Sequence, residues 1–287
     1  MVSGRPPWVL PGREMGFAGG TRIMGVVNVT PDSFSDGGKF QDHDAAVAQG
    51  LRLADEGADI LDVGGESSRP GSRPVSAAVE IDRVIPVIRQ LAERSSAVIS
   101  VDTTKAEVAA AALDAGATVI NDISALRADP EMAPLAAKRR AGVVLMHMLG
   151  TPRTMQDNPT YQDVVAEVCD FLAQRLQSAV AAGIDQRRLV LDPGIGFGKT
   201  LEHNLLLVRH LKRLHSLGRP VLLGASRKAF LGVLTGRREA GQRLWSSLGV
   251  HVLGAALGAD IVRVHDVAPV REALLVGDAV MAAGGDL

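Results

Sequence analysis

Residues 57–72 read GADILDVGGESSRPGS and join a short apolar run to a long polar loop. The run that ends at Val63 has the length and composition of a buried strand. The chain then turns polar at once, with glycines, serines, Glu66, Arg69 and Pro70. A connection that only turns the chain needs about two to five residues. A polar loop of this length is therefore either disordered or functional.

The same alternation recurs along the chain from residue 22 onwards. Each apolar run is followed by a polar or glycine-rich break, and then by a stretch rich in alanine and leucine with helical spacing of its apolar residues. Runs that are apolar on both faces are typical of parallel strands. The eight predicted strands are RIMGVVN (22–28), ADILDVG (58–64), AVISVD (97–102), ATVIND (117–122), GVVLMH (142–147), RLVLDP (188–193), PVLLGA (220–225) and DIVRVH (260–265).

Eight strands alternating with helical stretches predict the fold class. The count is that of an α/β protein with a single (β/α)8 barrel, the TIM barrel. A doubly wound open sheet is the alternative, but it often carries G-x-G-x-x-G after its first strand, and NVTPDSFSDGG (28–38) does not match that pattern. We place the barrel domain at residues 21–285. Residues 1–20 are rich in glycine and proline, and we expect them to form a loosely ordered N-terminal arm.

The composition narrows the possible partners and the compartment. The chain has 287 residues, 46% of them apolar, and a formal net charge of -1, which argues against nucleic acid or an anionic membrane as the main partner. The single cysteine, Cys169, excludes a disulfide within the chain. No apolar run approaches the roughly 20 residues that span a bilayer, and the first residues lack a signal-peptide pattern. We therefore expect a cytoplasmic protein.

Polar side chains gather at the predicted strand ends. In a barrel the chemistry lies at the carboxyl ends of the strands. Helix capping or turn formation could explain any one of these residues, but it does not explain the whole ring. The residues at or just beyond the strand ends are Asn28, Asp62, Asp102, Asn121, Met146, Asp192, Gly224, Ser226, Lys228, Arg263 and His265.

These side chains divide by chemistry. Four carboxylate or amide groups (Asp62, Asp102, Asn121 and Asp192) together with Lys228 could bind the edge of a flat heterocycle rich in N–H and C=O groups. Since buried polar groups are costly unless paired, the set implies a polar ligand.

The remaining strand-end groups suit an anion and a metal ion. Arg263 and His265 suit an anion, because barrels often bind phosphate near strands seven and eight. Asn28 could give a neutral oxygen to Mg²⁺, which takes few protein ligands. Met146 would offer an apolar wall to a planar ring.

Two tempting motifs do not carry a function of their own. PGIGFGKT (193–200) resembles a phosphate loop, but Pro193 stands where a Walker A motif requires glycine. GASRKAF (224–230) does not satisfy the G-x-S-x-G nucleophile elbow. His147 has no second ligand at metal spacing, and we interpret it as a loop or core histidine.

With these residues in view, the chain resembles the dihydropteroate synthase family, the folate-pathway enzymes that sulfonamides inhibit. The motifs run in order over residues 22 to about 267, which is essentially the whole domain. They are MGVVNVTPDSFSDGG, ADILDVGGESSRPG, ISVDTTKAEVA, VINDIS, LVLDPGIGFGKT, VLLGASRKAFLG and DIVRVHDV.

The resemblance implies a reaction and a role for each matched residue. The family joins 6-hydroxymethyl-7,8-dihydropterin pyrophosphate to p-aminobenzoate, and it releases pyrophosphate with the help of Mg²⁺. Residues matching the pterin contacts are Asp62, Asp102, Asn121, Met146, Asp192, Phe197, Gly224, Lys228 and Arg263. Residues matching the pyrophosphate contacts are Asn28, Ser68, Arg69, Arg263 and His265, with Asn28 also at the metal. Residues matching the p-aminobenzoate pocket are Phe34, Pro70 and Ser226. The catalytic group implied is Asp36, Arg69, Lys228, Arg263 and His265.

This resemblance gives the loop at residues 62–72 a purpose. Arg69 and Ser68 would reach the pyrophosphate when the loop closes, and closure would exclude water from a reactive intermediate. Two alternatives remain: a methyltetrahydrofolate-type methyltransferase barrel, which would lack the pyrophosphate loops, and a non-catalytic pterin-binding paralogue, in which those loops should have eroded. The family also implies a homodimer, and Trp245 could belong to its surface.

Overall fold

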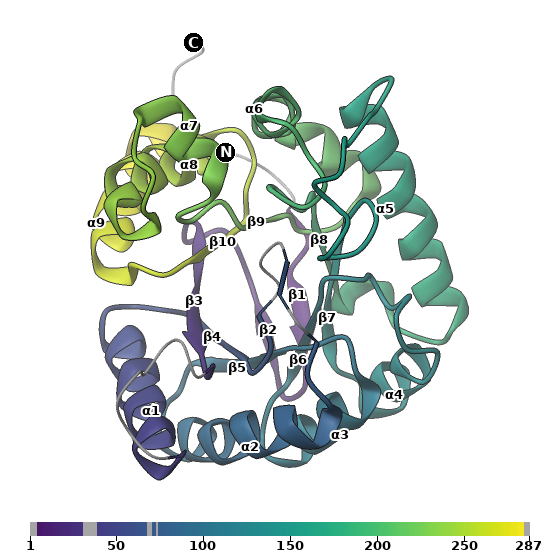
Figure 1. Ribbon diagram of the computed structural model, residues 1–287. Coiled ribbons are helices and arrows are strands. Elements are labelled where there is room, and N and C mark those ends of the chain that lie inside the picture. The colour runs from purple at the N-terminus through teal and green to yellow at the C-terminus, as the bar shows by residue number, and fades with distance from the viewer. Residues whose placement is uncertain (1–4, 31–38, 68–70, 73, 284–287) are drawn as a thin grey trace.

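The computed structural model describes residues 5–30, 39–67, 71–72 and 74–283, with the side chains of 39–42 left aside. Within these residues eight parallel strands form one sheet in the order β8-β7-β6-β5-β4-β3-β10-β9. A bridge between Leu191 and Val221 joins β8 to β9 and closes the sheet into a barrel. Helices surround the strands on the outside (Figure 1). The predicted (β/α)8 barrel is therefore confirmed.

All eight predicted strands are present, each within two residues of its expected bounds. Seven of the eight are shorter than the apolar runs, because hydrogen-bonded pairing does not extend to the ends of those runs, and the first has the predicted bounds. They are β3 (Arg22–Asn28), β4 (Ile60–Gly64), β5 (Val98–Asp102), β6 (Val119–Asp122), β7 (Gly142–Met146), β8 (Leu189–Asp192), β9 (Leu222–Leu223) and β10 (Ile261–Val264).

The helices follow the strands as expected, with two additions. The sequence patterns did not single out the short helices α4 (Met132–Arg139) and α7 (Ala229–Thr235). The helical segment after β8 consists of α6 (Leu201–Arg209) and a 3-10 segment, η3 (Leu211–Leu217). The others are α1 (Lys39–Asp55), α2 (Ala77–Arg94), α3 (Ala106–Asp114), α5 (Val164–Ala181), α8 (Leu244–Ala256) and α9 (Val267–Ala282). Across the described residues, no helix combines the length and the apolarity that crossing a bilayer requires.

One buried residue from each barrel strand forms an apolar layer inside the barrel. Strand side chains alternate between faces, so a residue two positions further on points to the same side. Two positions beyond the apolar layer, the interior carries Asp62, Asn121, Asp192 and Arg263 among others. The layer itself consists of Met24, Ile60, Val98, Val119, Val144, Val190, Leu222 and Ile261, which pack in one cluster.

A short hairpin covers the base of the barrel. Strands β1 (Trp8–Leu10) and β2 (Arg13–Met15) pair antiparallel, and Trp8 is fully buried in the apolar layer, with its Nε1 donating to the Arg188 carbonyl over 2.7 Å. The expectation of a loosely ordered arm is wrong for this segment. Three-residue strands are too short to give a pattern in the sequence.

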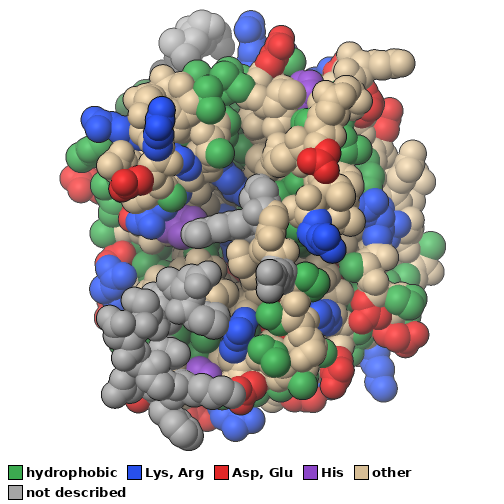
Figure 2. All heavy atoms as spheres, in the orientation of Figure 1, with side chains coloured by type: hydrophobic (Ala, Val, Ile, Leu, Met, Phe, Trp, Pro, Cys, Tyr) green, Lys and Arg blue, Asp and Glu red, His purple; other side chains and the backbone are tan. Residues whose placement is uncertain are grey.

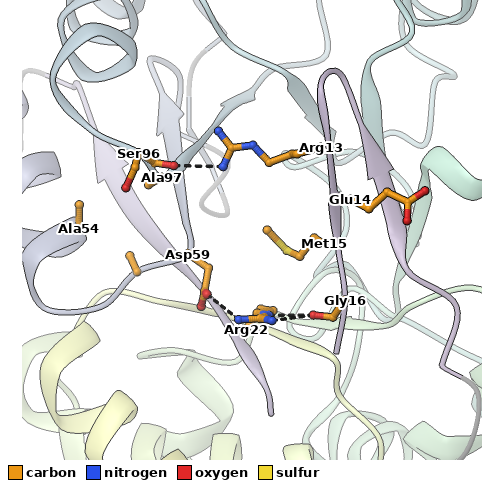
Figure 3. A pocket seen from close by; sticks show the side chains of 10 residues that line it. Arg13, Glu14, Met15, Gly16, Arg22, Ala54, Asp59, Ser96 and Ala97 are labelled. Atoms are coloured by element: carbon orange, nitrogen blue, oxygen red, sulfur yellow. Dashed lines mark hydrogen bonds and ion pairs between the residues drawn. The ribbon is translucent and has the colours of Figure 1, made fainter. Parts of the chain in front are cut away.

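A polar cavity of about 360 Å³ lies between the hairpin and the barrel (Figure 3). Arg13 donates to the Ser96 carbonyl over 3.0 Å, and Arg22 donates to the Gly16 carbonyl and pairs with Asp59 (Figure 3). These contacts tie the hairpin to the barrel strands. The cavity lies at the amino ends of the strands, opposite the predicted site.

Candidate functional site

The next layer of interior side chains, towards the carboxyl ends of the strands, forms the floor of the site. Asp62 is fully buried on β4, and its Oδ2 accepts from Asn121 Nδ2 over 2.9 Å and from Arg263 Nε over 2.7 Å. The second carboxylate oxygen of Asp62, Oδ1, is buried and accepts no hydrogen bond in the structure. Three strands thus contribute one connected polar group, and a buried acceptor remains for a ligand.

Asp102 lies at the end of β5, two residues beyond Ser100, which is the residue in register with Asp62. Its Oδ2 accepts from Arg263 Nη2 over 2.8 Å, so Arg263 bridges Asp62 and Asp102. Burial raises the pKa of Asp102 to about 7, although the charge of Arg263 opposes this and that of Asp62 adds to it. The carboxyl group therefore changes charge near neutral pH.

Asp192 lies at the end of β8, across the interior from Asp62. Burial raises the pKa of Asp192 to about 6, against the Gly194 N–H and the charges of Lys228, Lys199 and Arg263. A Cβ on Gly224 would lie 3.8 Å from both Asp192 and Arg263, so this glycine separates the two side chains on the floor.

Apolar side chains line one wall of the site. Met146, Met148, Met155 and Phe197 pack together with Ile123. The Lys228 ammonium lies 4.0 Å from the centroid of the Phe197 ring, a cation–π contact. The predicted apolar wall at Met146 and the predicted cation at Lys228 are thus brought together around Phe197.

The loop after β9 presents Ser226 and Lys228, and it is held from two sides. Ser226 Oγ lies 3.0 Å from His265 Nδ1 and accepts from the His265 backbone N–H. Arg227 adopts a left-handed φ of 58° and forms a two-pronged ion pair with Asp266. The Arg227 backbone N–H donates to Ser247 Oγ over 2.8 Å. The residues predicted for p-aminobenzoate and for pyrophosphate are therefore direct neighbours here.

A second cavity, of about 310 Å³, opens beside Asp102. In its lining Lys105 pairs with Glu66 and, over 2.6 Å, with the fully buried Glu80. Glu66 also accepts from the Val75 N–H, so it joins the two ends of the polar loop after β4.

Of the remaining predicted site residues, the structure describes one and does not describe the other five. Asn28 ends β3 and lies in register with Gly64. Within the described ranges, no three His, Cys, Asp or Glu side chains converge as a metal site. Phe34, Asp36, Ser68, Arg69 and Pro70 lie outside the described residues.

Two buried side chains next to the site received no functional role from the sequence. Lys199 is 4% exposed and lies 2.9 Å from His147 Nδ1. The signal was present in GFGKT, which places a lysine in the loop between β8 and α6, on the side of the barrel that carries the site.

Comparisons with known proteins agree with this geometry. Residues 24–265 match the family model described as pterin binding enzyme. The chain is 48% identical over 269 residues to the dihydropteroate synthase of Mycobacterium leprae, covering 92% of this chain and 94% of the relative. It is 45% identical over 261 residues to that of Escherichia coli K12, covering 91% and 92%.

Solved structures give the same result. A Xanthomonas albilineans dihydropteroate synthase with 4-aminobenzoic acid has a TM-score of 0.91 and 52% identity, covering 97% of this chain and 99% of that one. The same enzyme with 7,8-dihydropteroate gives 0.88 and 50%, covering 96% and 99%. A Yersinia pestis synthase in complex with a sulfonamide drug gives 0.91 and 42%, again covering 96% and 99%. The chain therefore belongs to the pterin-binding enzymes and, among them, to the dihydropteroate synthase family. The resemblance found in the sequence is confirmed, and the methyltransferase and non-catalytic alternatives are not favoured.

Proposed function

We propose that the protein is a dihydropteroate synthase, a transferase that condenses 6-hydroxymethyl-7,8-dihydropterin pyrophosphate with p-aminobenzoate to give 7,8-dihydropteroate and pyrophosphate. The observation that carries this proposal is the polar floor formed by Asp62, Asn121, Asp192 and Arg263 inside an apolar barrel. Carboxylate and amide groups at this depth suit the N–H and C=O edge of a pterin ring. Phe197 and Met146 would lie against the faces of the ring.

The reaction breaks the bond between the exocyclic methylene carbon and the pyrophosphate oxygen. The electron-rich dihydropterin can carry positive charge on that carbon, so the residues mainly need to stabilise the departing anion. Arg263 and His265 lie at the end of β10 for this role. The amine nitrogen of p-aminobenzoate then forms the new bond and loses a proton. Since the amine is a weak nucleophile, holding it in line with the carbon supplies much of the rate.

The pairing of Arg263 with Asp102 bears on substrate binding. In the structure Arg263 Nη2 binds the carboxylate that we assign to the pterin edge. Substrate N–H groups can therefore either join the guanidinium at Asp102, on its second oxygen, or replace it there, while Asp62 keeps its bond to Arg263 Nε. Replacement would make Nη2 available to the pyrophosphate.

We further propose that Mg²⁺ assists the reaction and that Asn28 gives it one oxygen. Asn28 ends β3 at the mouth, and its neutral amide oxygen suits a hard cation that keeps most of its waters. Bound there, the ion would supply positive charge to the departing pyrophosphate. The donor set fits an ion shared with substrate, because a permanent all-protein site needs several oxygen ligands from the chain.

A homodimer is proposed from the apolar surface of three helices. Eight large apolar side chains stand at least half exposed on α7, α8 and α9, which lie next to one another (Figure 1). Figure 2 shows hydrophobic side chains among the charged ones at the upper left, where these helices lie. Patches of this kind mark protein interfaces. The eight are Val233, Leu234, Trp245, Leu253, Leu275, Val276, Val280 and Met281.

We also propose a location in the cytoplasm. A chain with one cysteine, partly buried on α5, fits a reducing compartment.

Pyrophosphate release by the purified protein tests the function. The assay contains the dihydropterin pyrophosphate and Mg²⁺, with p-aminobenzoate present or omitted. We expect release that depends on p-aminobenzoate, together with dihydropteroate formation. Lys228→Ala should abolish it, whereas Lys138→Ala, the same change at an exposed position on α4, should not. Pterin binding without any turnover in the unaltered protein would contradict the proposal.

A further inference from the structure

Lys199 is a buried lysine that the proposed reaction does not use. It follows β8 in the segment 193–200 and is 4% exposed. Its Nζ donates to the Phe197 carbonyl over 3.0 Å and lies 2.9 Å from His147 Nδ1. Burying an ammonium group is costly unless its N–H groups are satisfied. A lysine kept at this cost beside the site needs an explanation.

His147 is built to accept a hydrogen bond from Lys199. Burial, together with the charge of Lys199, lowers the pKa of His147 to about 2, so the ring stays neutral. A neutral ring facing an ammonium at Nδ1 accepts there and carries its proton on Nε2. The ring also packs edge-on against Phe171, with centroids 4.8 Å apart. Its backbone N–H donates to the Asp192 carbonyl, so it is fixed relative to the end of β8.

The segment 193–200 is held tightly around this pair. Gly194 has a φ of 67°, and a Cβ there would approach the His147 carbonyl oxygen to 1.9 Å. Tyr161 Oη donates to the Gly198 carbonyl over 2.7 Å. Between these two glycines lies Phe197, whose carbonyl binds Lys199 and whose ring lies under Lys228. Lys199 therefore acts on the site through Phe197.

We propose that Lys199 is a positioning residue for the pterin end of the site: its bond to the Phe197 carbonyl fixes the backbone that carries the ring under Lys228, and its charge favours the carboxylate form of Asp192, which is to accept substrate N–H groups. The inference rests on the proposed function, because it takes the pterin as the ligand of Asp192. It assigns no contact between Lys199 and the substrate.

The proposed effect of the Lys199 charge on the ionisation of Asp192 can be measured. Asp192 faces three cations: Lys228 from the loop after β9, Arg263 from β10, and Lys199 from its own loop, besides the Gly194 N–H. Even so, burial raises its pKa to about 6. Removing one of the three cations must raise it further. Burial lowers the pKa of Lys199 to about 7, so Lys199 is charged in the range where Asp192 titrates.

The test is the pH profile of kcat/KM for the dihydropterin pyrophosphate in Lys199→Met. We expect KM for this substrate to rise about tenfold and KM for p-aminobenzoate to stay within about twofold. The acid limb should have two steps, because Asp102 titrates above Asp192, and the lower step, that of Asp192, should move to higher pH by about half a unit or more. Lys199→Arg keeps the charge and should keep the acid limb in place. Tyr161→Phe loosens the same loop without changing charge, and it too should leave the acid limb unmoved.

A second variant covers the case in which Lys199→Met does not fold, as judged by thermal unfolding. Lys199→Gln can still donate to the Phe197 carbonyl but has no charge, and it must show the same shift. An acid limb unmoved in an active, folded Lys199→Met or Lys199→Gln overturns the inference. If the unaltered protein forms no dihydropteroate, the proposed function fails, and the inference is then decided by the pH dependence of 6-hydroxymethylpterin binding, which needs no turnover.

Discussion

Arg263 donates from Nη2 to Asp102 Oδ2 over 2.8 Å, so two residues assigned to the pterin are paired with each other. Asp62 completes the arrangement by accepting from Arg263 Nε. The guanidinium thus bridges two carboxylates at the bottom of the mouth with two of its five N–H groups, and the other N–H groups can donate to a substrate anion.

Replacing this arginine should affect both stability and rate. Arg263→Met leaves two largely buried carboxylates without their cation, and we expect a loss of about 3 kcal/mol in the free energy of unfolding. The leaving anion also loses a donor, so turnover should fall about 100- to 1,000-fold. Urea unfolding and steady-state kinetics measure the two effects. Arg237→Met, at an exposed position, is the matched control, and unfolding curves that coincide for both variants would contradict the pairing.

Because of Asp102 and Asp192, we expect activity and stability to change in opposite directions as the pH rises. Their pKa values in the folded protein, about 7 and about 6, lie above the ordinary value of 3.8. A raised carboxyl pKa favours folding at low pH, and this stability is lost as the pH rises from about 4 through 6–7. Accepting N–H groups from the pterin requires the ionised form, so kcat/KM should rise over the upper part of this window.

Asp102→Asn isolates the contribution of Asp102 to the pH dependence of stability from the contributions of the other titrating groups. The variant cannot ionise at position 102, so its stability relative to the unaltered protein should increase as the pH rises from 5 to 8, in the window set by the raised pKa of Asp102. Denaturant unfolding at several pH values gives the difference directly. A difference that stays constant with pH would mean that Asp102 does not titrate in this range.

The loop carrying Ser226 and Lys228 depends on a serine of α8. Ser247 is 1% exposed, accepts from the Arg227 N–H and donates to the Arg243 carbonyl over 2.7 Å. Ser247→Ala leaves the Arg227 N–H without an acceptor, at a cost of about 1–3 kcal/mol. Displacement of Lys228 should lower kcat/KM on the order of tenfold. Ser246→Ala is the control, because Ser246 donates to the same Arg243 carbonyl, while the acceptor of the Arg227 N–H is Ser247. Equal losses in the two variants would contradict a role for Ser247 in holding it.

The hairpin at the base should matter for stability and not for chemistry. Trp8 is fully buried and lies at the end of the barrel opposite the site. Trp8→Ala should cost about 3–5 kcal/mol of unfolding free energy, while kcat at low temperature stays unchanged. Trp8→Phe keeps most of the packing and loses the bond to the Arg188 carbonyl, which should cost about 1 kcal/mol. A large fall in kcat for the folded Trp8→Ala protein would show that the hairpin influences the mouth.

Much of the site could be predicted because its polar side chains stand at the ends of apolar runs. Asp62, Asn121, Asp192 and Arg263 were singled out from those positions and from the family resemblance together, and the alternation of strand side chains explains why all four face the interior. The partners of Arg263 could not be predicted in this way. They depend on the rotamer of a long side chain and on contacts with residues 161 and 201 positions away.

The hairpin and the buried pair of Lys199 with His147 could not be predicted from the sequence, for two different reasons. Trp8 and Leu10 are buried by the barrel base rather than by any periodic neighbour in the sequence, so nothing local marks them. A buried lysine is rare, so the residue type alone predicts a side chain exposed to solvent. Only the tertiary structure places the Lys199 ammonium between a carbonyl group and a neutral imidazole.

The apolar face of α7, α8 and α9 leads to a prediction about assembly. Trp245 is 76% exposed on α8, which is unfavourable for a large aromatic side chain unless another surface covers it. Trp245→Glu places a charge on this face and should convert a dimer to a monomer at micromolar concentration. Sedimentation velocity measures the change. Leu205→Glu, at an exposed apolar position on α6, is the matched control and should leave the mass unchanged. A monomeric unaltered protein would contradict the proposed dimer outright, whereas a dimer unaffected by Trp245→Glu would place the interface on another face.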